Sequence, residues 1–350
     1  MTFDSFVTSV TQDEIVAKVT DTILASNVLC LRLMSKGKPW SGEQMRFPIK
    51  TSRNTSMGSY EGFDTFTTTK VNTRQRLSFD LRAFYASATL SNMEIAANSG
   101  KAQVLQLTKV EMESVQQDMI DQIGTLLYST GIGNGNKDFL GLGAIVDDAT
   151  DVGTYGGLAR ATFTTLNATR TASGGTLTVA LMGALYNACA YGSDRPSLGI
   201  ANETVWGLYE QLLQPTVNAN YDAGGFMQVT RDGVTPRGAL KGEIGFDSLF
   251  FRGMPIVRDE KSTAQTLWFL NEKYLNWYGA KHPSFKAVSL GSETIAGQYD
   301  QVPSKNHGFN WSGFKEPTNQ DAVTGQFLVY GNLISENPNR HGRLTGISGI

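Results

Sequence analysis

The sequence predicts an α+β protein in which a long hairpin and a long helix precede a larger unit of mixed helices and strands. Three observations support this prediction. Two runs near residues 45 and 80 alternate apolar and polar side chains, as half-buried strands do. Residues 98–130 repeat apolar side chains at helical spacing, and the rest of the chain mixes short helical and strand-like patterns.

The composition favours a folded protein with a sizeable core and few charges. Of 350 residues, 40% are hydrophobic and only 18% are charged, below the usual share of about a quarter. The net charge is −2, whereas proteins that grip nucleic acid through its phosphates usually carry a basic excess. Both cysteines, Cys30 and Cys189, sit among apolar residues, which predicts buried free thiols.

The N-terminal region predicts a helix over Thr11–Asn27. Thr11 and Glu14 form a capping box, and Ile15, Val19 and Ile23 recur on one face. Acids stand where a signal peptide would have bases, and the apolar runs are too short to span a bilayer. We therefore expect no membrane association and a soluble, reducing compartment.

The predicted hairpin has strands around Met45–Ile49 and Leu77–Ala83. Between them, 12 of the 20 residues of Thr51–Lys70 are Ser, Thr, Asn or Gly, so the tip cannot bury itself on its own body. Its sparse apolar side chains suit anchoring on another surface, and its bases can meet acids there. The candidate contact residues are Arg46, Lys50, Arg53, Met57, Tyr60, Phe63, Phe66, Lys70, Arg74 and Arg76.

Residues Asn98–Thr130 predict one long helix. Leu105, Met112, Val115, Met119, Ile123 and Leu126 form its apolar stripe. A helix over this range would be on the order of 40 Å long, which is long for a compact domain and suggests a helix that supports an extended molecule along its length.

The rest of the chain predicts a mixture of helices and strands. Helices are predicted over Leu177–Ala190 and Glu203–Leu213, and strands within Arg195–Asn202, Leu249–Glu260 and Thr266–Tyr278. Residues Gly325–Ser348 predict two short strands around an Asn-Pro turn.

The glycine-rich stretch Gly131–Gly143 does not have the pattern of a phosphate-binding loop. The third glycine of a dinucleotide fingerprint is missing in every register, and the helix precedes the glycines, so its carbonyl end faces them. A helix cap and hinge is the prediction that fits.

Other chemical constellations are equally weak. His282, His307 and His341 lack metal-ligand spacing. Asp147–Asp151 lacks the calcium-loop pattern and predicts a solvated turn. The aromatics Trp268, Phe269, Tyr274, Trp277 and Tyr278 predict core packing. We therefore expect no catalytic, cofactor or metal site, and no enzyme.

With these elements in this order, the chain resembles the major capsid proteins of tailed phages with the HK97-type fold. Five stretches carry the resemblance: Asn98–Val115, Lys137–Asp148, Arg195–Leu212, Met254–Trp277 and Val329–Ile347. It implies an N-terminal arm over 1–40, an extended hairpin loop over 41–88, and a peripheral domain over 89–150 with the spine helix. Residues 301–350 would complete that domain, and residues 151–300 would form an α/β axial domain.

The resemblance also implies a function. The subunit would self-assemble into pentamers and hexamers of an icosahedral shell, with each hairpin lying across a neighbour. The shell would enclose double-stranded DNA without sequence-specific binding, in the virion and, during assembly, in the host cytoplasm. Portal and decoration proteins are conceivable partners, and any scaffold is expected to be a separate protein.

Two other hypotheses stay open. The first is an encapsulin-like compartment subunit of the same fold, which encloses a protein cargo. The second is an unrelated enzyme of mixed α/β build, which would be a small oligomer rather than a shell.

Overall fold

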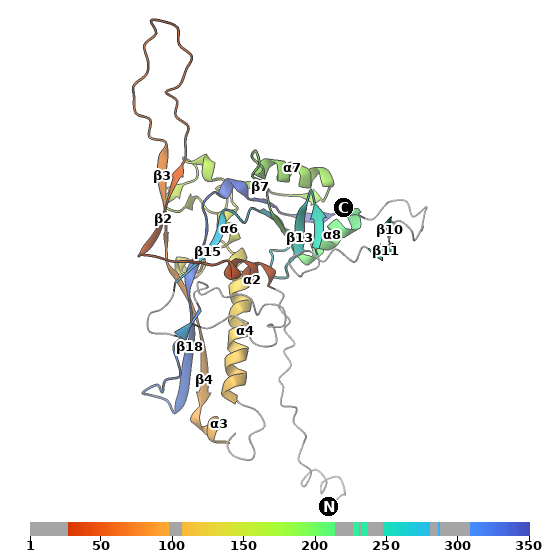
Figure 1. The fold of residues 1–350 in the computed structure, drawn as a ribbon. Helices are drawn as coiled ribbons and strands as arrows, with labels where there is room; N and C mark the ends of the chain where they lie inside the picture. The colour runs from red at the N-terminus through yellow and green to blue at the C-terminus, as the bar shows by residue number, and fades with distance from the viewer. Residues whose placement is uncertain are drawn as a thin grey trace, which may run out of the picture.

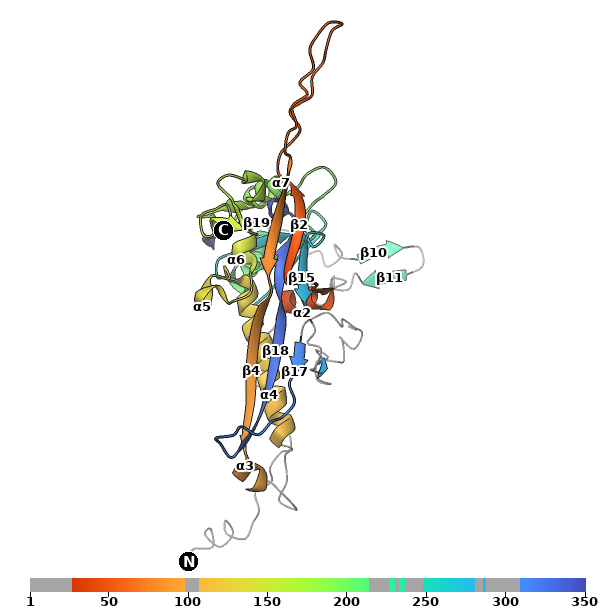
Figure 2. The same ribbon diagram turned by 90° about the vertical axis from the view of Figure 1, so that its left-hand side faces the viewer.

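The computed structural model describes residues 27–97, 107–213, 227–230, 233–236, 248–280, 286–287 and 309–350. The predicted helix over Thr11–Asn27 and the histidines His282 and His307 lie outside the described residues, apart from Asn27 itself. The body is elongated, with a long sheet and a long helix at one end and a helix-covered sheet at the other (Figure 1). A thin hairpin continues beyond the second end (Figure 2).

The long sheet is built around β18 (Ala322–Ser335). Strand β4 (Arg82–Ser91) runs antiparallel to it from Ala322↔Ser91 to Gly331↔Arg82. Strands β15 (Leu275–Gly279) and β17 (Phe309–Trp311) also pair with β18, and extend the sheet to β1 (Lys38–Pro39) and β16 (Lys286–Ala287). The prediction of two short strands within Gly325–Ser348 is therefore wrong for the first strand, which has 14 residues.

Helix α4 (Leu107–Tyr128) lies along this sheet, beside β4 and β18 (Figures 1 and 2). Its 22 residues give a length of about 33 Å. The predicted stripe is its buried face: Met119 and Ile123 are fully buried, and Met112 and Val115 pack against the core. The predicted start at Asn98 and the stripe residue Leu105 lie outside the described residues.

The second sheet has the strand order β12-β13-β9-β14-β19-β7. Its strands are β12 (Ser248–Phe251), β13 (Met254–Arg258), β9 (Leu198–Ala201), β14 (Leu267–Leu270), β19 (Gly342–Leu344) and β7 (Thr169–Thr171). Two pairs are parallel, β13 with β9 and β19 with β7, and the rest are antiparallel.

Both faces of this second sheet are buried. Helices α7 (Val179–Cys189) and α8 (Glu203–Leu213) cover one face, where Phe269 and Ile256 pack against them. Because side chains alternate along a strand, Trp268 and Val257 point to the opposite face, into the core shared with α4. The predicted helices and strands of this region and the buried positions of Trp268, Phe269, Trp277 and Tyr278 are confirmed.

Helix α2 (Val28–Ser35) belongs to the same core, although its residues fall in the range assigned to an N-terminal arm. The Asn27 side chain caps it by accepting from the Cys30 N–H, and donates to the Ile120 carbonyl. The buried Asp259 carboxylate accepts from the Leu29 N–H (3.0 Å) and the Tyr128 hydroxyl (2.9 Å). Cys30 and Cys189 are buried and free, as predicted.

The glycine-rich stretch packs closely on the end of α4. It contains α5 (Gly133–Asn136) and α6 (Leu142–Ile145), and Gly131 adopts a positive φ of 70° just after the helix. A β-carbon on Gly141 would lie 2.3 Å from the Ser129 carbonyl oxygen and 2.6 Å from that of Leu126. These glycines therefore allow backbone to cross backbone at the carbonyl end of the helix.

Short elements complete the fold. They are α3 (Asn92–Ala97), β5 (Thr154–Tyr155), β6 (Leu158–Ala159), η2 (Thr164–Leu166), β8 (Gly175–Thr176), β10 (Met227–Thr230), β11 (Gly233–Pro236), η3 (Pro338–Arg340) and β20 (Ile347–Gly349). In the described part of the chain, no helix combines the length and apolar character needed to cross a membrane.

Candidate functional site

The candidate site is the hairpin formed by β2 (Gln44–Lys50) and β3 (Arg74–Asp80). The two strands pair without a register shift, from Gln44↔Asp80 to Lys50↔Arg74. Residues 51–73 continue beyond the strands as an irregular loop, which extends far from the body (Figure 2). The alternating run predicted over Leu77–Ala83 is two strands, because Leu81 separates β3 from β4.

The two faces of the paired strands differ in chemistry. One face is apolar: Phe47 contacts Phe79 and Tyr278, with ring centroids 6.2 and 5.6 Å apart, so the hairpin base is anchored to the long sheet. The other face is basic. Opposite residues of antiparallel strands share a face, so Arg46, Lys50, Arg74 and Arg76 gather on the exposed side.

All ten candidate contact residues are exposed. Arg46 donates to the Gln44 side chain, and Arg53 donates to the Tyr191 hydroxyl of the body (3.2 Å). Tyr60 and Phe66 contact each other at 4.9 Å, yet each remains about two-thirds exposed, and Phe63 is fully exposed. The structure thus pairs Tyr60 with Phe66 in the loop, leaves Phe63 at the tip, and places Lys50, Arg74 and Arg76 on the stem.

The tip of the hairpin is a tight turn that sequence reasoning did not single out. The Asp64 N–H donates to the Glu61 carbonyl (2.9 Å), and the Glu61 N–H donates to the Asp64 carboxylate (2.8 Å). The turn therefore holds two acids on either side of the exposed Phe63. Residues 54–69 contain these two acids and no base, whereas six bases and no acid occupy residues 46–53 and 70–76.

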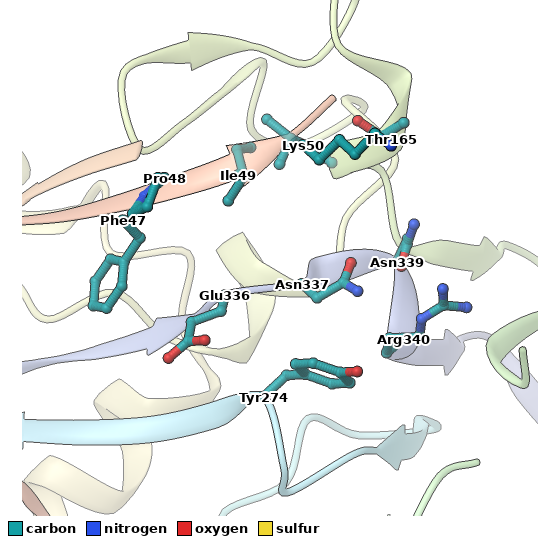
Figure 3. A pocket seen from close by; sticks show the side chains of 11 residues that line it. Phe47, Pro48, Ile49, Lys50, Thr165, Tyr274, Glu336, Asn337, Asn339 and Arg340 are labelled. Atoms are coloured by element: carbon teal, nitrogen blue, oxygen red, sulfur yellow. The ribbon is translucent and has the colours of Figure 1, made fainter. Parts of the chain in front are cut away.

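A groove of about 570 Å³ lies at the base of the hairpin (Figure 3). Phe47, Ile49 and Lys50 of β2 form one wall, Thr165 of η2 lies beside Lys50, and Leu166 also lines the groove. The floor and the far wall come from Tyr274 and from four residues after β18: Glu336, Asn337, Asn339 and Arg340. Apart from Lys50, no residue of this groove was among the predicted site residues, since its walls come from distant parts of the chain.

Charged and aromatic side chains surround this groove. The Arg340 guanidinium stacks 4.6 Å from the Tyr191 ring, whose hydroxyl accepts from Arg53. Asp194 accepts from the Tyr274 hydroxyl (2.7 Å) and pairs with Lys273 (2.9 Å). The hydrogen bond from Tyr274 is the main reason that the pKa of Asp194 lies below its usual value.

The prediction of a solvated turn over Asp147–Asp151 is wrong. Asp147 is fully buried and pairs with Arg343 (2.8 Å), while Arg170 lies 3.7 Å away. Its carboxylate also accepts from the N–H groups of Ala149, Asp151 and Val152. The cluster therefore fixes this turn to β19 and β7, and its acids are occupied by arginines.

The described residues offer little for covalent or metal chemistry. Burial raises the pKa of the Cys189 thiol to about 12, which disfavours the reactive thiolate. Among the described residues, no group of three or more His, Cys, Asp or Glu side chains is placed to hold a metal ion.

Comparison with known proteins decides the fold. No family model matches the sequence, and no curated protein does. The chain is similar to a subunit of the cyanophage A-1(L) capsid, with a TM-score of 0.69 and 14% identity over 98% of this chain and 99% of that one. The chain has the HK97-type capsid fold.

Two other structures with the HK97-type fold are also similar to this chain. The capsid of the myovirus phage XM1 matches with a TM-score of 0.56 and 13% identity over 95% of this chain and 96% of that one. The holo-SrpI encapsulin complex of Synechococcus elongatus matches with a TM-score of 0.56 and 10% identity over 99% and 96%. At these identities the similarity establishes the fold.

Proposed function

We propose that this chain is the structural subunit of an icosahedral viral capsid, the major capsid protein of a tailed phage. It would self-assemble into pentamers and hexamers that enclose the phage genome. The capsid fold supports this proposal, because the chain matches the cyanophage capsid structure over 98% of its length with a TM-score of 0.69.

The single observation that carries the proposal is the exposed hairpin. A fully exposed Phe63 and the largely exposed Met57, Tyr60 and Phe66 lie in a loop that extends away from the body, and the described residues leave these side chains uncovered. Large apolar side chains gathered in this way on a soluble protein mark an interaction site. A neighbouring subunit would cover them in a shell, where head-to-tail contacts close into rings.

The parts of the subunit follow from this proposal. Helix α4 would be the spine of a peripheral domain over 89–150 and 301–350, and residues 151–300, with α7 and α8, would form the axial domain. Two strands cross this division: β19 comes from the peripheral range but pairs within the second sheet, and β15 comes from the axial range but pairs with β18. The loop 41–88 would lie across a neighbour, and residues 1–40 would include the arm. Scaffolding, portal and decoration proteins are the partners that such a shell would take, and double-stranded DNA would be enclosed without sequence-specific contacts.

Electron microscopy of the purified protein tests the proposal. We expect hollow particles, tens of nanometres across on the scale of such shells, when the chain is expressed alone or with its neighbouring genes. A monomer or dimer under both conditions, measured by sedimentation, would contradict it.

A second function, the cargo-enclosing compartment, is favoured by the encapsulin match. The contents of particles made in the native host separate the two. Nuclease-resistant DNA in the particles supports the viral capsid, whereas one co-purifying protein and no DNA supports the compartment.

A further inference from the structure

The turn Glu61–Asp64 is built to present Phe63. Its two mutual hydrogen bonds, one of them accepted by the Asp64 carboxylate, fix the turn, and Phe63 remains fully exposed between its two flanking acids. A fully exposed phenylalanine leaves a large apolar surface in water. The turn therefore needs a site that is apolar at its centre and cationic around it.

The groove at the hairpin base has this character. Phe47 and Ile49 supply apolar surface, and the cationic groups of Lys50 and Arg340 lie toward the same end (Figure 3). The one acid of the groove, Glu336, lies at the end near Phe47 and is in contact with the Tyr278 hydroxyl (3.4 Å). At about 570 Å³, the groove falls within the range of sites that hold small ligands or large side chains.

Two polar atoms of the groove point to a missing partner. Within the described part of the chain, Arg340 Nε and Asn339 Oδ1 are buried without a hydrogen-bond partner. Such atoms are costly, and each calls for an explanation. A carboxylate would accept from the guanidinium, and a backbone N–H of a turn would donate to the amide oxygen, after small rotations of these two side chains.

The hairpin cannot bring its own tip to its own groove. The groove contains Lys50, where β2 ends, and the loop leaves that point and extends away from the body (Figures 1 and 2). The partner must then be another molecule, and the complementary turn is present on every copy of this chain.

We infer that the Glu61–Asp64 turn of one subunit docks in the hairpin-base groove of a second copy. Phe63 would lie on the apolar wall, with its flanking acids facing Lys50 and Arg340. This inference rests on the proposed function and adds the site to which the hairpin binds. Each subunit gives one turn and receives one, which is a head-to-tail contact of the kind that closes into rings.

Disulfide trapping tests the inference. Gly62→Cys and Thr165→Cys are introduced together; both sites are exposed, a β-carbon on Gly62 meets nothing within 4 Å, and Phe63 is kept. The native cysteines are buried. Mild oxidation of assembled particles should give a ladder of covalent multimers, with the 62–165 link identified by mass spectrometry. The matched control, Gly62→Cys with Ser114→Cys on the exposed side of α4, should give none.

A charge swap supplies a second readout. Lys50→Glu should raise the concentration needed for half-maximal assembly by about tenfold, and Glu61→Lys in the same chain should restore most of that loss. Both residues are exposed and lie outside the cores, so the variants should keep the circular dichroism spectrum of the unaltered protein.

The outcomes separate this inference from the proposed function. If particles of the 62/165 variant form normally but give no 62–165 link, the docking site is overturned and the shell is left intact. The same holds if the control variant gives a 62–114 link and the 62/165 variant gives none. If Glu61→Lys does not restore the assembly lost in Lys50→Glu, the docking site is likewise contradicted and the proposed shell is not. If the unaltered protein forms no particles, the proposed function fails, and the docking site falls with it.

Discussion

Some buried residues take part in polar contacts that could not be predicted from the sequence. The sequence predicts a solvated turn at Asp147, since the run lacks the calcium-loop pattern, yet the principal partner of Asp147, Arg343, lies 196 positions further along the chain. Nothing local distinguishes it from Asp148, which remains partly exposed. Only the pairing of β19 with β7 brings the arginines to the turn.

Asp147→Asn should lower the free energy of unfolding by about 1.5–3 kcal/mol, because it removes the fully buried carboxylate charge from Arg343, which then keeps only Asp151 as its acidic partner. Asp148→Asn is the matched control, and we expect a change within about 0.5 kcal/mol there. Chemical denaturation followed by circular dichroism measures both. Equal effects of the two substitutions would show that the buried pair does not stabilise the fold.

His341 is a neutral, fully buried imidazole at the junction of the two sheets. Its Nδ1 accepts from the Asn271 N–H (3.1 Å), so Nε2 carries the proton and donates to the Ser335 hydroxyl (2.9 Å). Burial lowers its pKa to about 3. In the unfolded chain the pKa would be about 6.5, so between these values the unfolded state binds one more proton.

This difference predicts a loss of stability as the pH falls below about 6.5, at up to about 1.4 kcal/mol per pH unit. Between pH 7 and pH 5, the wild-type free energy of unfolding should fall by about 2 kcal/mol more than that of His341→Gln, which cannot titrate. Denaturation curves at the two pH values measure this difference. Parallel losses in both proteins would mean that His341 is not the group responsible.

At the scale of elements, local patterns predicted what depends on local chemistry. The helix over Glu203–Leu213 has the predicted bounds, since its apolar spacing and flanking residues lie within one stretch. Strand β18 was underestimated because its full length depends on β4, β15 and β17, which come from distant parts of the chain. The break at Leu81 likewise reflects a change of partner, from β2 to β18.

The glycines after α4 give a prediction about this junction. Gly141→Ala would place a β-carbon within 3 Å of three helix-end carbonyl oxygens, all backbone atoms that cannot rotate away. We expect a loss of about 1–3 kcal/mol in the free energy of unfolding. Gly153→Ala, where a β-carbon meets nothing within 4 Å, should be nearly neutral. A neutral Gly141→Ala would show that the stretch is a loose hinge rather than a packed crossing.

At the scale of the whole molecule, the hairpin loop stands apart from both hydrophobic cores. The buried clusters include Phe79 and Leu77 at its base, but nothing between residues 51 and 73. The sequence predicted this loop and its exposed side chains because polar composition and sparse aromatics are local features. The sequence did not predict the groove at the base of the loop, because β2, η2 and the segment after β18 come together only in the folded chain.

Replacing Arg53–Thr69 by a short Gly-Ser turn therefore separates folding from assembly. The paired strands β2 and β3 and their anchors, Phe47 and Phe79, are kept, so the subunit should remain folded and soluble. Closed shells should be lost or greatly weakened, because the exposed aromatics and the acidic turn go with the loop. Circular dichroism and sedimentation, on the same sample, measure the two properties.

Phe63→Ala is the milder companion of this deletion and should weaken assembly in the same direction, since it removes the most exposed ring of the loop. A deletion that unfolds the subunit would place the loop in its own core, against the exposure of residues 57–70. Shells that form at normal yield without the loop would show that subunits are held together elsewhere, and that the hairpin is not a clamp between them.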